Sequence, residues 1–376
     1  MYSPPKRRGV LLLSTVHSVI DPRIMGKIRP VLLPHYEVYC ALVKTHSADD
    51  SLSLTQKLNL HAFANFRRLL WRLVWLHPQA LWYFLKIRPQ IVHIFVAELL
   101  PLAFVFRWLG AEVIYEVQEN LYKKIPLKSY NRGWFFERMF RYFDQQARQS
   151  FKFVLTEDAY LQEYKDLLRP FAIVHNFAES RWLSWPLPQP DYRNPSFFYA
   201  GVISLERGFD TMVAALKKVS LQYPNVHLRL FGHLRISEES LRNLSDYEAM
   251  QNHLTFYGYV SQEQAFEYAK TSLAGIVLLK PVGDYVDSYP TKLFDYMALG
   301  LPVITSDLPL LKEVIEAHQC GFCVSAYDAD SLAHAMITCI ENPVLMTQIG
   351  QNGRDAVIHK YNWEKEGASL LNLYGN

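Results

Sequence analysis

The chain has 376 residues, of which 50% are hydrophobic and 14% aromatic, and its formal net charge is +3. A chain of this length and composition can bury one large core or two. Its four cysteines argue against a disulfide scaffold and fit a reducing cytoplasm, and no apolar run reaches the roughly 18 residues needed to span a bilayer.

The charge is unevenly distributed along the chain. Residues 1–183 carry 25 Lys and Arg against 15 Asp and Glu, whereas residues 184–376 carry 14 against 21. A basic half joined to an acidic half indicates that the first half faces something anionic, and nucleic acid and membrane surfaces are both candidates.

Short apolar runs that suit buried parallel strands recur along the first half, with helical stretches between them. The predicted strands are GVLLLST (9–15), EVYCALV (37–43), IVHIFVA (91–97), EVIYEV (112–117) and FVLTE (153–157). The first of these follows a basic leader that could mimic a signal peptide. The apolar run is followed by His17 and Asp21 and not by a small-residue cleavage site, so we expect a first β-strand there.

The segment from Gln56 to Arg88 breaks this alternation. Three Trp, several Phe and Leu and a set of basic residues share a region that we expect to be helical. Such a helix can lie at a membrane interface, with its rings at headgroup depth and its cations on anionic lipid, or it can pack on the core with a basic solvent face. A second basic aromatic stretch, Asn131 to Phe143, favours membrane contact, whereas no nucleic-acid reading motif is present.

The second half repeats the alternation of strands and helices. Its predicted strands are SFFYAGV (196–202), VHLRLFG (226–232), LTFYGYV (254–260), LAGIVLL (273–279) and LPVITS (301–306). Strands that alternate with helices predict parallel sheets, and the Pro-rich stretch 184–196 predicts a hinge between two doubly wound α/β domains. We place these domains at 1–183 and 184–359, expect a helix over 360–376 to pack back on the first, and expect ligands in a cleft between them.

Two short motifs favour structural interpretations. The sequence CGFC, Cys320 to Cys323, follows a helix that we expect to end at a Gly, and a turn into a strand explains it better than redox chemistry. The acidic pair in DAD, Asp328 and Asp330, precedes a helix, and Asp330 is predicted to be its N-cap rather than a metal ligand.

The stretch YPTKLF predicts a helix entrance suited to phosphate. A helix N-terminus presents unpaired N–H groups and a partial positive charge, and Thr291 and Lys292 lie in its first turn. Asp295, one turn further in, could accept hydrogen bonds from sugar hydroxyls. The alternative is a solvated Lys and an acidic residue that complements the helix dipole.

A second phosphate candidate follows the first strand of the second half. The strand ends at Gly201, and the loop that follows carries Arg207 and Gly208 before the next helix. An Arg side chain can fork onto phosphate oxygens, although a Gly, a loop and an Arg form a weak signal alone.

Together these two elements resemble the C-terminal half of glycosyltransferase family 4, whose enzymes have two Rossmann-like domains in the GT-B arrangement. The resemblance continues through LTFYGYVSQEQ, which looks like the family's base-binding strand and loop and includes Tyr259, and is most specific in SYPTKLFDYMALGLPVI. In the first half, STVHSVIDPRIMGKIR and AELLPLAFVFRWLGAEVIYEVQEN are similar to a bacterial branch of the family.

The resemblance implies roles for several residues of the second half. Asp287 and Asp295 hold the spacing of the family's E-x7-E pair, so Asp295 would bind the donor ribose and Asp287 would approach the transferred sugar. Arg207 stands where the family has a phosphate-binding Lys, but Val202 replaces the usual Arg. Lys292 would supply the missing cation, since something must balance a leaving diphosphate.

The first half departs from the family at one position. The loop after its fourth predicted strand has Gln118 where a His is common, which puts a His-assisted step in doubt. Among the polar groups at strand ends, Glu98 and His17 are the candidates to meet the acceptor or donor sugar. The carboxylates Glu116 and Glu119 are further candidates, and surface or capping roles remain open for all of these residues.

The resemblance implies a metal-independent, retaining glycosyltransferase that needs no cofactor beyond its nucleotide-sugar donor. We expect a cytoplasmic enzyme, peripheral on the inner face of the plasma membrane, that acts on a lipid-linked acceptor in bacterial cell-surface polysaccharide or glycolipid assembly. The alternatives are a nucleotide-sugar epimerase or phosphorylase on the same scaffold, or an inactive relative that docks at membranes or partners.

Overall fold

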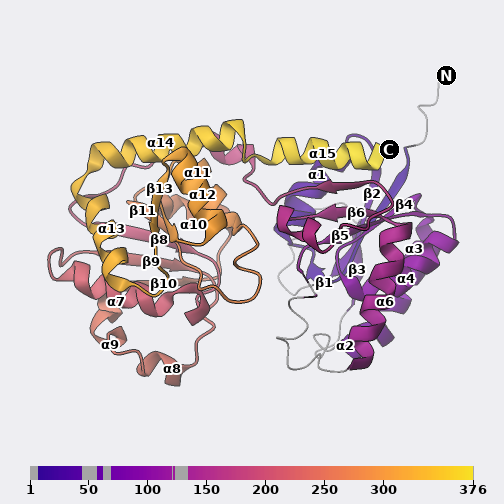
Figure 1. The fold of residues 1–376 in the computed structure, drawn as a ribbon, viewed down its shortest axis with the longest axis horizontal. Coiled ribbons are helices and arrows are strands. Elements are labelled where there is room, and N and C mark those ends of the chain that lie inside the picture. The colour runs from indigo at the N-terminus through magenta and orange to yellow at the C-terminus, as the bar shows by residue number, and fades with distance from the viewer. Residues whose placement is uncertain (1–6, 45–56, 62–68, 121, 123–133, 376) are drawn as a thin grey trace. The chain divides into compact units, whose positions relative to one another are not determined.

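The chain divides into two α/β units, each built on a parallel sheet (Figure 1). The computed structural model describes residues 7–44, 57–61, 69–120, 122 and 134–375. Unit 1 comprises residues 1–176 and 365–376, and unit 2 comprises residues 177–364. Each unit has its own apolar core, so each folds around its own sheet.

Unit 1 contains a seven-stranded sheet in the order β3-β2-β1-β4-β5-β6-β7, with every neighbouring pair parallel. Its strands are β1 (Gly9–Ser18), β2 (Glu37–Val43), β3 (Lys57–Leu60), β4 (Ile91–Ile94), β5 (Glu112–Val117), β6 (Lys152–Leu155) and β7 (Phe171–Ile173). Its α-helices are α1 (Arg29–Leu32), α2 (Leu69–Trp71), α3 (His77–Ile87), α4 (Leu100–Trp108), α6 (Trp134–Ser150) and α15 (Trp363–Gly375). π-Helical turns at Pro22–Ile28 and Arg72–Leu76 lead into α1 and α3.

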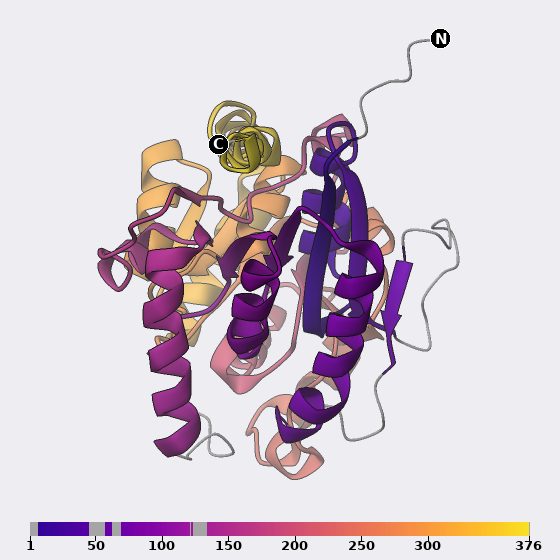
Figure 2. The same ribbon diagram turned by 90° about the vertical axis from the view of Figure 1, so that its right-hand side faces the viewer.

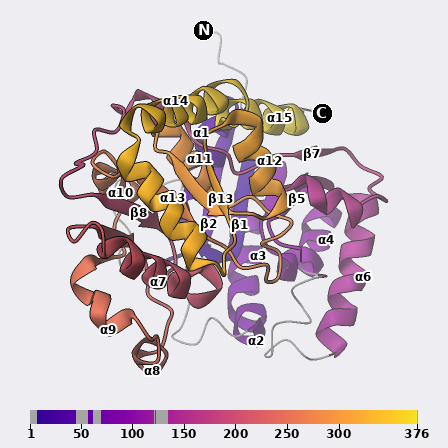
Figure 3. The same ribbon diagram turned by 60° about the vertical axis from the view of Figure 1, so that its left-hand side comes forward.

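Unit 2 contains a six-stranded parallel sheet in the order β10-β9-β8-β11-β12-β13. Its strands are β8 (Ser196–Ala200), β9 (His227–Phe231), β10 (Leu254–Gly258), β11 (Ala274–Val277), β12 (Val303–Ser306) and β13 (Gly321–Val324). Its helices are α7 (Phe209–Ser220), α8 (Glu238–Arg242), α9 (Tyr247–Met250), α10 (Gln262–Ala269), α11 (Thr291–Ala298), α12 (Pro309–His318), α13 (Ala329–Glu341) and α14 (Pro343–His359). Helices α7 and α13 cover one face of the sheet, and α10, α11 and α12 cover the other (Figure 3). Their buried side chains belong to two separate apolar clusters.

The structure confirms all ten predicted strands and corrects part of the Trp-rich segment. Residues Lys57–Leu60 form β3, which pairs in parallel with β2, instead of opening a helix. The reason is the alternation in this stretch, because Leu60 is fully buried in the core while Leu58 packs beside it. The helical prediction is confirmed from Leu69 to Ile87, and residues 62–68 lie outside the described part of the chain.

Two capping predictions were also wrong. The N-cap of α13 is Asp328, whose carboxylate accepts from the amides of Asp330 and Ser331, so Asp330 lies in the first turn. The helix before CGFC ends at Gln319, which adopts the left-handed conformation at φ 48°, rather than at a Gly. The cysteines then enter β13 as predicted, and burial raises the pKa of the Cys320 thiol to about 12.

The Pro-rich stretch 184–196 lies inside unit 2, and the units divide after residues 176 and 364. Arg354 of α14 donates to the carbonyl of Trp185 at 2.9 Å, and the ammonium of Lys270 lies 4.3 Å from the centre of the Trp185 ring. The amide of Gln189 donates to the carbonyl of Lys270 at 2.7 Å. These long-range contacts hold the predicted hinge against the rest of unit 2. Amino-acid composition alone does not reveal them.

Helix α15 closes unit 1 from the far end of the sequence (Figure 2). The Tyr374 hydroxyl lies 2.7 Å from Nδ1 of the buried His93 on β4, and Lys152 of β6 donates to the carbonyl of Leu373 at 2.9 Å. On the first turn of α15, Glu366 accepts from the amide of His175 at 2.6 Å. The last helix is therefore part of the unit 1 core.

Among the residues that the structure describes, no helix is both long and apolar enough to cross a membrane.

The ion pairs of His175 predict a pH-dependent stability for unit 1. Burial lowers the pKa of His175, but hydrogen bonds to Asp158 and Glu366 outweigh burial and raise it from 6.5 to about 9. Because the folded pKa exceeds the unfolded value, this stabilisation is complete below about pH 6.5 and is lost as the pH rises through about 9. Urea unfolding of the wild type should show a falling free energy of unfolding across this window.

The variant Glu366→Gln should flatten that dependence, because the amide cannot favour the imidazolium. Glu364→Gln is the matched control, since Glu364 lies on the same helix but bonds Ser180 in unit 2. Equal slopes for the two variants would show that His175 does not carry the effect.

Candidate functional site

The strand order of unit 2 places a switch point between β8 and β11. From β8 the chain continues outward through β9 and β10, and it then returns to the other side of β8 and runs outward through β11, β12 and β13. The loops after β8 and β11 therefore leave the sheet in opposite directions, and ligands of open α/β sheets bind in the crevice at such a point. The first loop carries Gly201 and Arg207, and the second leads to Lys292.

Helix α11 is fixed against the end of β8 by a buried tyrosine. The amide of Ala200 donates to the hydroxyl of Tyr296 at 2.8 Å, and the Tyr296 side chain is fully buried. The ring passes over Gly275 of β11, where a Cβ would lie 2.2 Å from a ring carbon. Only glycine leaves room for this ring, so Gly275 sets how closely α11 approaches the sheet.

The entrance of α11 has no side-chain cap. Pro290 is the N-cap residue, with ψ 121°, and Thr291 is the first helical residue, so Thr291 and Lys292 lie in the first turn as predicted. The N-cap residue provides no side-chain hydrogen bond to the first-turn amides, and Leu293 donates to the carbonyl of Pro290. An uncapped N-terminus offers its amides and partial positive charge to an anionic ligand.

Lys292 points from this entrance into the protein. Its side chain is 8% exposed, and its Nζ finds no hydrogen-bond acceptor among the described residues. Nζ lies 3.7 Å from the centre of the Tyr199 ring. Burial, and then the neighbouring Arg207, hold the pKa of Lys292 well below its usual range.

The backbone at Gly201 is the meeting place of the two cations. A Cβ built on Gly201 would lie 3.4 Å from Nη1 of Arg207 and 3.9 Å from Nζ of Lys292. Gly201 itself has φ 137°, which side chains rarely adopt. Arg207 is half-buried beside Tyr285, with its Nε 3.4 Å from the Tyr285 hydroxyl. The structure thus brings together three of the predicted residues, around a space that a side chain would otherwise fill.

The two predicted carboxylates flank this entrance. Asp295 is buried on the next turn of α11 and accepts from Nε2 of Gln262 at 3.0 Å. Asp287 is half-buried in the preceding loop, where its amide donates to the carbonyl of Asp284 at 3.1 Å. Sequence reasoning missed Gln262, whose only signal was its place at the start of α10 beside the base-binding stretch.

Tyr259 lies at the carboxyl end of β10 and keeps 63% of its surface exposed. Its ring stacks on His233, which follows β9, with the centres 5.2 Å apart and the planes within 8°. An exposed pair of flat rings at this edge can stack a nucleobase. His233 was not predicted.

The unit 1 candidates lie at the corresponding switch point, between β1 and β4. Glu98 accepts from the hydroxyl of Thr15 and forms a two-pronged ion pair with Arg72 at 2.7–2.9 Å. Nδ1 of His17 lies 2.8 Å from the hydroxyl of Ser14. Glu98 is therefore engaged by the Trp-rich segment, from which Arg72 comes.

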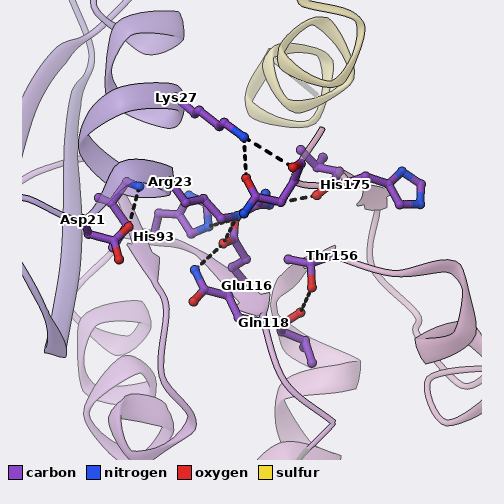
Figure 4. A network of polar contacts seen from close by, with 12 residues as sticks. Asp21, Arg23, Lys27, His93, Glu116, Gln118, Thr156 and His175 are labelled. Atoms are coloured by element: carbon purple, nitrogen blue, oxygen red, sulfur yellow. Dashed lines mark hydrogen bonds and ion pairs between the residues drawn. The ribbon is translucent and has the colours of Figure 1, made fainter. Parts of the chain in front are cut away.

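Glu116 belongs to a buried network rather than to an exposed strand end (Figure 4). Arg23 donates to Oε1 of Glu116 at 2.8 Å, Gln118 donates to the same oxygen at 2.7 Å, and His93 lies 3.6 Å from Oε2. Burial raises the pKa of Glu116, but Arg23 and His93 outweigh burial and lower it, while burial lowers the pKa of His93 to about 4. An ionised Glu116 thus holds Gln118, the residue that replaces the family's His.

Within the described ranges, no group of three or more His, Cys, Asp and Glu side chains is arranged to hold a metal ion. Independence from metals stays a prediction.

Comparison with known proteins identifies unit 2. Residues 189–356 match the family described as "Glycosyl transferases group 1". This part of the chain is similar to the group 1 glycosyltransferases. The finding bears out the family resemblance that the sequence suggested for the second half of the chain.

Curated relatives match slightly less than half of the chain. The phosphatidyl-myo-inositol mannosyltransferase of Mycobacterium leprae is 29% identical over 168 residues, which is 45% of this chain. The match spans only 42% of the length of that relative.

Solved structures extend the similarity to the whole fold. Sucrose-phosphate synthase from Thermosynechococcus elongatus superposes with a TM-score of 0.75 and 17% identity, over 98% of both chains. Anabaena HepE, solved in complex with UDP-glucose, superposes with a TM-score of 0.70 and 12% identity, over 98% of this chain and 100% of its own. At these identities the likeness shows the fold alone, which is the GT-B fold of two doubly wound units.

The gap at Gly275 gives a first prediction. In Gly275→Ala the new methyl meets the Tyr296 ring, which must shift and weaken its bond to Ala200, so we expect a loss of about 1–3 kcal/mol or more in the free energy of unfolding. Gly375→Ala is the control, because a Cβ there meets no atom within 4 Å. Thermal unfolding checks both, and a Gly275→Ala protein as stable as the wild type would contradict the proposed packing.

Proposed function

We propose that the chain is a glycosyltransferase that moves a sugar from a nucleotide-sugar donor to an acceptor hydroxyl. One observation carries the proposal: Lys292 and Arg207 converge on Gly201 at the uncapped entrance of α11, inside the part of the chain that is similar to the group 1 glycosyltransferases. Two cations and a row of free amides suit a diphosphate, which is the leaving group of a nucleotide sugar.

The donor roles follow from this placement. The first-turn amides at Thr291 and the backbone at Gly201 would cradle the diphosphate, with Lys292 and Arg207 as its counter-charges. Asp295, whose carboxylate is steadied by Gln262, would accept hydrogen bonds from the ribose. Tyr259 would offer a platform for the base. The UDP-glucose complex of HepE supports a nucleotide sugar as the class of donor for this fold.

The chemistry would rest on stabilising the leaving group. The bond between the anomeric carbon and the diphosphate oxygen breaks as the acceptor oxygen bonds to that carbon and loses its proton. Negative charge then grows on the diphosphate, where the fixed cations and amides stabilise it. Asp287 would approach the transferred sugar, and Glu98 and His17 would face the acceptor. Retention of configuration, and independence from metals and cofactors, belong to the proposal by resemblance.

The acceptor we propose is lipid-linked, presented at an anionic membrane surface in glycolipid or polysaccharide assembly. The name of the Mycobacterium leprae relative supports it, since phosphatidyl-myo-inositol is a lipid. Unit 1 supports it with an apolar surface along α2 and α3, termed here the Trp surface, whose members are between 43% and 63% exposed. They are Leu70, Trp71, Val74, Trp75, Trp82 and Leu85.

Basic side chains border the Trp surface, as an anionic bilayer requires. The ammonium of Lys86 lies 5.1 Å from the centre of the Trp82 ring, and Arg88 ends the helix. Trp rings beside Lys and Arg are typical of segments that lie at a membrane interface. Of the second stretch, 131–143, residues 131–133 lie outside the described part, and Arg141 pairs with Glu137 at 2.9 Å. A cytoplasmic enzyme on the inner face of the plasma membrane fits these features.

Replacing Lys292 tests the donor site. The variant Lys292→Met keeps the length of the side chain but removes the cation, so nucleotide-sugar turnover should fall by about 100-fold or more. Lys270→Met is the control, because Lys270 lies in the same unit and pairs with the exposed Glu267. Release of UDP or GDP from a panel of nucleotide sugars measures turnover.

The outcomes separate the possible functions. A wild type that neither binds any nucleoside diphosphate nor turns over any nucleotide sugar would overturn the transferase proposal and leave a binding module. Turnover that yields an isomerised nucleotide sugar without transfer would indicate an epimerase. Unchanged turnover in Lys292→Met would show that the diphosphate binds elsewhere.

Replacing two members of the Trp surface tests membrane contact. Trp71→Ser with Trp82→Ser should weaken binding to vesicles of anionic phospholipid by about tenfold or more, because each ring contributes about 1.5–3 kcal/mol on burial. Val344→Ser with Leu345→Ser, on exposed positions of α14, is the control. Sedimentation with vesicles measures binding, and equal binding by both double variants would contradict the membrane proposal.

A further inference from the structure

Lys292 differs from a solvated surface lysine, because its amino group is buried and no described residue hydrogen-bonds it. The one group that it meets closely is the face of the Tyr199 ring, at 3.7 Å. The Tyr199 hydroxyl is occupied elsewhere, since it donates to the carbonyl of Val202 at 2.6 Å.

The charged and titratable groups around Lys292 come from three segments. Strand β8 and the turn after it contribute Tyr199 and Arg207, and the loop before α11 contributes Tyr285, which lies beside Arg207. Helix α11 itself contributes Asp295, which accepts from Gln262. Of these, Arg207 is the group whose charge acts on Lys292, and it acts against a second positive charge.

Physical chemistry disfavours an ammonium in this position. A buried charge without a hydrogen-bond partner loses its hydration and shifts toward its neutral form. The ring face of Tyr199 returns only about 0.5–2 kcal/mol, and the guanidinium next to it adds repulsion. These effects act together on the pKa of Lys292, which falls well below its usual range through burial first and Arg207 second.

A diphosphate reverses this balance. It would bring two negative charges to the point where Nζ and Nη1 approach Gly201, and each can accept a hydrogen bond from the lysine. Opposite charge at hydrogen-bonding distance raises the pKa of an amine, so the bound state favours the ammonium.

We propose that Lys292 is a neutral amine in the empty site and takes up one proton when the donor diphosphate binds. The inference rests on the proposed function and adds a regulation to it. The proton comes from solvent and bonds to the lone pair of Nζ, and the same proton leaves when the diphosphate leaves. Donor binding is thereby coupled to pH, with an affinity that falls as the pH rises between the free and bound pKa values of Lys292.

Calorimetry of the wild type tests the inference directly. We would titrate it with UDP-glucose and with GDP-mannose, whose diphosphate diesters carry no titrating proton near neutral pH. At one pH, the enthalpy of binding in phosphate, HEPES and Tris should vary with the ionisation enthalpy of the buffer, and the slope should correspond to uptake of about one proton. The dissociation constant should rise by up to about tenfold per pH unit between the free and the bound pKa of Lys292.

A matched pair of variants isolates Lys292. An Arg guanidinium cannot lose its proton in a protein, so Lys292→Arg should bind without proton uptake. Lys280→Arg is the control, because Lys280 is already paired with Asp210 at 2.7 Å and its replacement should leave proton uptake intact. If the larger Arg side chain does not fit, Lys292→Met serves the same purpose, because Met has no amine that could take up a proton.

The outcomes for this inference and for the function are distinct. Wild-type binding of either nucleotide sugar without proton uptake overturns the inference and leaves the transferase proposal standing. Equal uptake in the wild type and Lys292→Arg also overturns it, since another group would then carry the proton. If the wild type binds no nucleotide sugar and turns none over, the proposed function fails and the inference fails with it.

Discussion

The hydrogen bond from the Ala200 amide to the buried Tyr296 hydroxyl is the constraint on which the candidate site depends. It holds α11 against the end of β8, and Gly275 provides the gap that the Tyr296 ring needs. The buried hydroxyl has to find a partner, so the bond also fixes the rotation of the helix. With that rotation set, Lys292 lies one turn before Tyr296 and Asp295 directly before it. Lys292 then meets the Arg207 loop at Gly201.

The two units treat buried charge in different ways. In unit 1, Arg23 and Glu116 are paired in the interior, and Gln118 completes the pair, so the charges stabilise a fixed arrangement. In unit 2, the buried Lys292 has a ring face and a second cation beside it instead of a counter-ion. An uncompensated group in the interior costs stability, and proteins keep such groups where a ligand completes them. The contrast indicates that the buried Arg23 and Glu116 of unit 1 are each other's counter-ions, whereas an anionic ligand would supply the counter-charge for Lys292 in unit 2.

Much of this architecture could be predicted from local patterns. Each apolar run that was predicted as a strand is a strand, because buried parallel strands depend on short hydrophobic segments. The four residues of β3 were missed because the Trp-rich sequence after them masks their alternation. The Pro-rich stretch looked like a hinge because composition does not show Arg354 and Lys270, which lie far along the chain and hold it.

For the candidate site, too, local sequence predicted the residues but not their long-range contacts. Helix signals and family resemblance predicted the residues at the entrance of α11, but the burial of Lys292 depends on Tyr199 and Gly201, about 90 positions earlier in the sequence. Likewise, no local pattern reveals that Arg72 engages Glu98 or that Gln262 steadies Asp295. The identity of a site residue can be read locally, whereas its charge state is set by distant neighbours.

Helix α15 has a consequence for the order in which the protein is made. His93 and Tyr374, which bond to each other, are separated by 281 positions, and all of unit 2 lies between them. On the ribosome, unit 2 is therefore complete before unit 1 receives its last helix. Until α15 has been synthesised, the surface around His93 that this helix buries stays exposed. The nascent unit 1 therefore remains incompletely folded while unit 2 folds.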